Sequence, residues 1–187
     1  MEDWPDKSKA ENILEEWTKN KNLRKHAYAV EAAMRAYAAK FGEDVEKWGV
    51  VGLLHDFDYE KYPTLEDHPF KGVEYLKEQG YSDELTEAIL AHAEHTGTTR
   101  DTVLKKCIFA VDELTGLIVA VALVRPSKKL EDVTVESIQK KWKEKAFAAG
   151  VDREIIERGA GELGVELTEH IETVLKAMQG ISEKLGL

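Results

Sequence analysis

The sequence contains little cysteine, little proline and no excess of positive charge. Its single cysteine, Cys107, excludes a disulfide within the chain and fits a reducing compartment. Only 4 of 187 residues are proline, and strand-like alternation of apolar residues is nearly absent, which favours helices. With 26 Lys and Arg against 36 Asp and Glu, the net charge is −10. We therefore expect no binding to duplex DNA or to anionic membranes.

Long hydrophobic segments are also rare. The longest apolar run, Cys107–Val124, contains Asp112 and Glu113, so it predicts a buried helix rather than a membrane span. The first nine residues are charged and polar, unlike a signal peptide, and we expect a cytoplasmic protein. The sequence leaves the oligomeric state open.

Apolar residues recur at helical spacing through most of the chain, which predicts an all-α fold. Gly42, Gly80 and the Arg125-Pro126 pair are expected helix ends. The expected helices cover residues 8–19, 23–41, 43–57, 68–79, 82–95, 102–124, 134–148, 152–163 and 167–184.

Histidine and aspartate interrupt the apolar faces of the expected helices. The interruptions are His26, His55, Asp56, His92 and Asp112. Taken singly, each is more often a core histidine or a hydrogen-bonded aspartate. Together they place buried carboxylates beside imidazoles with no Arg or Lys on the same faces, an arrangement that a divalent cation would stabilise. This donor set suits Fe, Mn, Co, Ni or Zn, and the lack of thiolates argues against a structural zinc site.

The order of His26, His55-Asp56 and Asp112 resembles the signature of the HD-domain superfamily of metal-dependent phosphohydrolases. In addition, His68 in His-Pro-Phe-Lys-Gly and His92 in Ala-His-Ala-Glu-His resemble the third and fourth histidines of that family. The resemblance covers about half of the chain. It implies an HD-domain helical bundle with additional C-terminal helices. We expect one domain over residues 1–187, with an HD core at about 22–125 and a helical extension at about 130–187.

The resemblance also implies a site with two divalent metal ions per chain, for which Mg is possible besides the metals named above. His26, His55, Asp56 and Asp112 would hold one ion, His68 and His92 the other, and Asp56 would bridge them. His55 and Asp56 are the implied catalytic residues. The implied reaction is cleavage of a phosphomonoester or phosphodiester, with a nucleotide as one candidate substrate, by a hydroxide that the metals activate.

Two departures from the family pattern affect this interpretation. Phe57, Asp58 and Tyr59 follow the His-Asp pair, where many members have Ile-Gly-Lys. Dinuclear phosphodiesterases of the family commonly have two consecutive histidines where this chain has His92-Ala93, so His95 could contribute to the site instead. The Gly-Tyr-Pro motif of the cyclic-dinucleotide branch is missing, which disfavours that substrate.

Two other functions share the same ligand pattern. It is similar to that of the HD-fold mixed-valence diiron oxygenases, such as myo-inositol oxygenase. A non-catalytic metal-binding ligand sensor is the remaining alternative. Hydrolysis is favoured because it is the commoner activity of the fold.

The acidic chain contains one basic segment, residues 125–145, with seven Lys or Arg against four acidic residues. It is either a solvated surface or a clamp for substrate phosphate. In the second case the substrate-binding residues would be Arg125, Lys128 and Lys141, besides His95; Arg100 is a weaker candidate.

Overall fold

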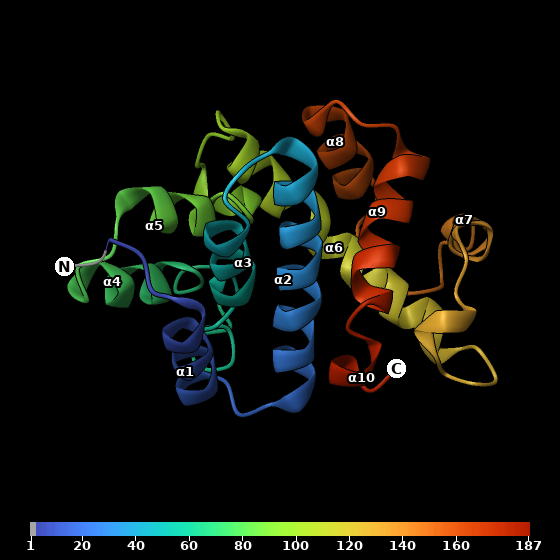
Figure 1. The fold of residues 1–187 in the computed structure, drawn as a ribbon, viewed down its shortest axis with the longest axis horizontal. Coiled ribbons are helices and arrows are strands. Elements are labelled where there is room, and N and C mark those ends of the chain that lie inside the picture. The colour runs from blue at the N-terminus through green and yellow to red at the C-terminus, as the bar shows by residue number, and fades with distance from the viewer. Residues whose placement is uncertain (1–2) are drawn as a thin grey trace.

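A computed structural model describes residues 3–187, which form ten α-helices, two short 3₁₀ helices and no strand. The predicted all-α fold is confirmed. None of the helices in these residues is long and apolar enough to cross a membrane. Figure 1 shows the long helix α2 upright at the centre, with the N-terminal helices on one side of it and the C-terminal helices on the other.

The N-terminal half contains five helices, most of which begin where a side chain caps the first turn. Asp6, Asn20, Asp44 and Ser82 accept hydrogen bonds from free backbone N–H groups at the starts of α1, α2, α3 and α5. The helices are α1 (Lys7–Trp17), α2 (Lys21–Phe41), α3 (Val45–Leu54), α4 (Phe70–Glu78) and α5 (Asp83–Leu90).

The C-terminal half is built on α6, whose inward face is almost wholly apolar. This helix packs against α2 and α5 on one side and against α8 and α9 on the other (Figure 1). The elements of this half are α6 (Val103–Leu123), α7 (Val135–Trp142), α8 (Arg153–Leu163), α9 (Leu167–Gln179) and α10 (Ser182–Leu185), with the 3₁₀ helices η1 (Glu94–Thr96) and η2 (Leu130–Asp132).

Several helices are shorter than the periodicity predicts. Helix α3 ends at Leu54, so Asp56 lies in the turns that follow it, and α5 ends at Leu90, so His92 is not on a helix as expected. The expected helix at 167–184 is divided into α9 and α10. In each case apolar residues continue beyond the helix end, because a turn buried in the core also needs apolar side chains.

Close packing of α2 and α3 brings their histidines together. A Cβ atom at Gly52 would lie 2.7 Å from Cα of Glu31, so only glycine allows this approach. Gly42 ends α2 in the left-handed conformation, with φ of 75°. The chain then turns back at once and lays α3 along α2 (Figure 1).

Candidate metal centre

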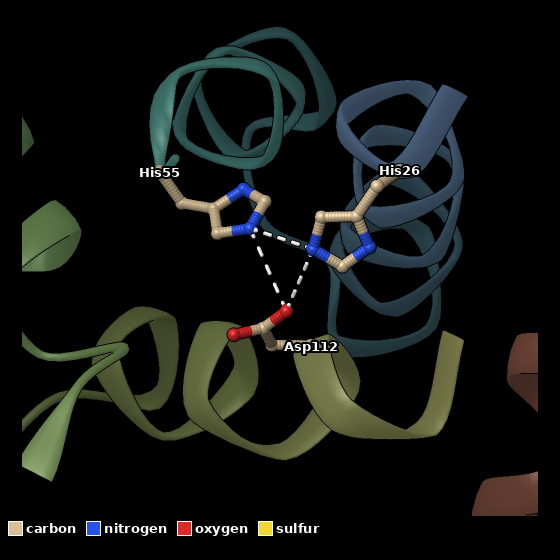
Figure 2. Close-up of side chains that lie close together, drawn as sticks. All are labelled: His26, His55 and Asp112. Atoms are coloured by element: carbon tan, nitrogen blue, oxygen red, sulfur yellow. Dashed lines mark hydrogen bonds and ion pairs between the residues drawn. The ribbon is translucent and has the colours of Figure 1, made fainter. Parts of the chain in front are cut away.

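The side chains of His26, His55 and Asp112 meet where α2, the end of α3 and α6 come together (Figure 2). His26 Nε2 lies 2.9 Å from Asp112 Oδ1 and 3.2 Å from His55 Nε2. His55 Nε2 is 3.5 Å from the same carboxylate oxygen. Three separate helices therefore each present one ligand atom to a common point.

Asp56, His68 and His92 form a second group beside the first. Asp56 Oδ1 lies 3.2 Å from Nε2 of both His68 and His92. The other carboxylate oxygen of Asp56, Oδ2, faces the first group, at 3.5 Å from His55 Nε2 and 3.7 Å from His26 Nε2. Asp56 therefore stands between the two groups with one oxygen directed to each.

Three histidine rings of the site are oriented by buried acceptors on the ring nitrogen that faces away from it. His55 Nδ1 donates to the carbonyl of Gly52 at 2.8 Å, and His92 Nδ1 donates to that of Ile89 at 2.5 Å. His68 Nδ1 donates to Asp58 Oδ1 at 2.7 Å. Because a carbonyl oxygen only accepts, these bonds leave the Nε2 lone pairs directed into the site.

Thr115 lies behind the fourth histidine, His26. Its hydroxyl donates to the carbonyl of Asp112 at 2.8 Å, and its oxygen lies 3.3 Å from His26 Nδ1. A hydroxyl that donates elsewhere can accept from this ring nitrogen, so His26 also has its Nε2 lone pair facing the site.

The electrostatics of the site favour added positive charge. Burial lowers the pKa of His55, but the charges of Asp56 and Asp112 outweigh it and raise that pKa to about 9. Burial also lowers the pKa of His68, and its hydrogen bonds to Asp56 and Asp58 raise the pKa to about 9. Burial raises the pKa of Asp112, yet the charge of His55 and the hydrogen bond from His26 bring it well below its usual value.

The donor set therefore fits divalent metal ions. Four imidazole nitrogens and two carboxylates converge, all of them acceptors once the Nδ1 hydrogen bonds are made, and a cation satisfies them together. His55 is fully buried, whereas the side chains of His26, Asp56 and Asp112 are 22–25% exposed. The site is thus deep in the fold but reachable from solvent on one side.

Asp58 supports the candidate site, and the sequence interpretation missed it. It is fully buried, and besides accepting from His68 it accepts from the backbone N–H of Gly72 at 2.7 Å. A Cβ at Gly72 would lie 2.9 Å from the Asp58 carboxyl carbon, so glycine is needed there. The signal available in the sequence was an aspartate two residues after the His-Asp pair, in the place of the family's usual glycine.

The structure does not bring the predicted substrate-binding residues into contact with the six ligands, with the exception of His95. His95 Nε2 donates to the carbonyl of His68 at 2.8 Å, so it supports the backbone of that residue. Arg100 is engaged in a two-bond ion pair with Glu162.

Lys141 does not contact the site, and neither do Arg125 and Lys128, which follow α6. Lys141 pairs with Glu144 at 2.8 Å, and Lys128 is exposed in the turn after α6. Within residues 3–187, no hydrogen bond or ion pair links Arg125, Lys128 or Lys141 to the two groups of ligands. Their predicted role in binding substrate stays a prediction.

Comparison with known proteins agrees with this geometry. The profile of the HD domain family matches residues 23–117, which include all six candidate ligands, the four histidines and two aspartates described above. The chain belongs to the HD domain family, whose members bind divalent metals and are typically metal-dependent hydrolases. No curated protein and no solved structure matches the chain at a significant level.

Proposed function

We propose that this protein is a metal-dependent phosphohydrolase that cleaves a phosphomonoester or phosphodiester at a site for two divalent metal ions. The observation that carries the proposal is the position of Asp56, whose two carboxylate oxygens face different groups of histidines. A carboxylate shared in this way is typical of two-metal sites.

Different residues of the chain would bind the two metal ions and orient the ligands. His26, His55 and Asp112 would hold one ion, His68 and His92 the other, and Asp56 both. When bound, such ions supply a water molecule of lowered pKa and positive charge for the phosphoryl oxygens. Gly52, Asp58, Ile89 and Thr115 would keep the four imidazoles in the required orientation.

The cations of the chain suit a phosphorylated substrate. Lys25 precedes a metal ligand, and no ion pair or hydrogen bond engages its ammonium group in the described part of the chain. A free cation in a cavity that His26 also lines can attract the negative charge of a phosphorylated substrate. We therefore infer that the partner is a small phosphorylated substrate rather than duplex DNA or a membrane.

The test is hydrolysis of small phosphoesters by protein reconstituted with Mn²⁺ or Co²⁺ under nitrogen. We expect activity without oxygen, since attack of water on phosphorus requires no oxidant. Asp56→Asn should abolish it, and Asp132→Asn, at an exposed aspartate, should leave it intact. Activity that requires iron and air, with oxygen uptake, would contradict the proposal and support the diiron oxygenase alternative.

A further inference from the structure

We propose that a cavity beside His26 binds the organic part of the substrate, and that this part is an alkyl or aryl group rather than a nucleoside. The inference rests on the proposed phosphohydrolase function. The cavity has a volume of about 330 Å³ and lies between the first turns of α2, the second half of α6 and the residues around α10. Its volume is within the usual range for small-molecule sites.

The cavity borders the candidate metal centre at His26. His26 belongs to both, since it is a candidate metal ligand and also part of the cavity wall. On α6, Gly116 and Val119 of the wall follow Asp112 by one and two turns, so they lie on the same face of the helix. A phosphoryl group at the ligands would therefore place its ester substituent along this face.

The walls are chiefly hydrocarbon. Val119, Leu123, Leu185 and Leu187 supply alkyl groups, and Gly116 supplies none. A Cβ at Gly116 would meet only Val151, at 3.7 Å, so there is open space at this point. A sugar or a nucleobase in such surroundings would lose hydrogen bonds to water without replacing them, whereas an apolar group gains by leaving water.

The cavity wall has few polar groups. Apart from His26, only Asn22 and Lys25 carry polar side chains on the wall, and both are on the first turns of α2. The ammonium group of Lys25 reaches toward the far wall, because a Cβ at Gly186 would lie 3.0 Å from it. The six candidate ligands would therefore take the anionic head of the substrate, and the alkyl side chains of the cavity its apolar tail.

The far wall is held in place by α10, which lies outside the matched HD segment. Lys184 pairs with Glu11 of α1 at 3.1 Å, and its ammonium group lies 3.6 Å from the ring centre of Tyr28. Leu185 is 1% exposed. Figure 1 shows α10 beside the lower end of α2, so the C-terminal extension forms a fixed part of the cavity.

The first experiment measures binding of phosphonates, which cannot be hydrolysed, to the Mn²⁺-loaded protein by calorimetry. We expect hexylphosphonate to bind at least about tenfold more tightly than methylphosphonate, because each buried methylene favours binding. Adenosine monophosphate should bind more weakly than hexylphosphonate. Equal affinity for the two phosphonates, or tighter binding of the nucleotide, would overturn the inference.

Matched variants locate the binding. Leu123→Gln places an amide on the wall, whereas Val124→Gln changes the next residue, which is similarly exposed and does not line the cavity. Of these two variants, only Leu123→Gln should remove the preference for hexylphosphonate. Gly116→Leu should also remove it by filling the cavity, and Gly161→Leu, at a helical glycine with open surroundings, should not. A preference that survives both cavity variants would contradict the assignment.

Turnover separates this inference from the proposed function. Hexyl phosphate should be hydrolysed with a higher kcat/KM than methyl phosphate. Selective hexylphosphonate binding without hydrolysis of either ester would uphold the cavity and refute the hydrolysis of phosphomonoesters. Hydrolysis of both esters at equal kcat/KM, with no binding preference, would uphold the phosphohydrolase and refute the cavity.

Discussion

Asp58 accepts a hydrogen bond from Nδ1 of His68 over 2.7 Å, while Nε2 of the same ring points into the metal centre. The buried carboxylate fixes both the tautomer and the direction of the ring. It also accepts from the backbone of Gly72 and so connects the turn after α3 to the start of α4. Asp58 is accordingly a positioning residue for the second group of ligands.

Removal of this carboxylate should affect metal binding and folding together. Asp58→Ala leaves two buried donors without partners, so we expect the free energy of unfolding to fall by about 1–3 kcal/mol. Affinity for the second metal ion should fall by about 10–100-fold, since such supporting groups have effects of this size. Urea unfolding and metal titration measure the two effects. Unchanged affinity would show that Asp58 has only a structural role.

The two groups of ligands should respond differently to single substitutions. His68→Ala should release one metal ion and retain the other, because His26, His55, Asp56 and Asp112 still converge. His55→Ala should reduce the content of both metal ions, because Nε2 of His55 lies close to Asp56 and to Asp112. Elemental analysis gives the count per chain. Asp132→Asn, at an exposed aspartate outside both groups, is the control and should retain both ions. Full metal content in His68→Ala would contradict the assignment.

Gly52 should be intolerant of any side chain. Gly52→Ala would place a Cβ 2.7 Å from Cα of Glu31, and backbone cannot yield as a side chain can. We expect a loss of about 1–3 kcal/mol in the free energy of unfolding, as for other overpacked sites. Gly161→Ala, in α8 with nothing near the added methyl, should be neutral or stabilising. Equal effects of the two substitutions in urea unfolding would refute this explanation.

His170 should make stability depend on pH. It is fully buried between the Tyr37 hydroxyl and the Ala110 carbonyl, and burial lowers its pKa to about 4 from 6.5. Below pH 6.5 the unfolded chain therefore binds a proton that the folded chain refuses, and stability falls until the pH reaches the folded pKa.

The magnitude follows from these two pKa values. Between pH 7.5 and 5.0 the contribution of His170 should fall by about 2 kcal/mol. Denaturant unfolding of the wild type and His170→Gln at both values isolates this contribution, because other titrating groups cancel in the difference. The destabilisation caused by His170→Gln should thus be smaller at pH 5.0. A destabilisation that does not change with pH would show that His170 has an ordinary pKa.

The apolar pattern predicted most of the helices and the inward position of five of the six candidate ligands, whereas His68 was predicted only from the family resemblance. Apolar periodicity locates α2 and α6, and histidines that interrupt an apolar face must point into the core. The early end of α5 was not predictable, since Ala91 and His92 continue its apolar pattern in a turn.

The contacts that support the histidines could not be predicted from the sequence for a different reason. Asp58 and Thr115 act on His68 and His26 across 10 and 89 residues, and only the packed structure brings them together. The sequence indicated a phosphate clamp at residues 125–145 because the Lys and Arg residues of this segment are close together in the sequence. The structure instead places Lys25, on the first turns of α2, in the wall of a cavity that His26 also lines.

The central claim, two metal ions that share Asp56, is tested most directly by anomalous diffraction from crystals of the Mn²⁺-loaded protein. We expect two anomalous peaks about 4 Å apart. One should lie among His26, His55 and Asp112, the other beside His68 and His92, with one oxygen of Asp56 directed to each. A single peak, or two peaks of which neither contacts Asp56, would contradict the account.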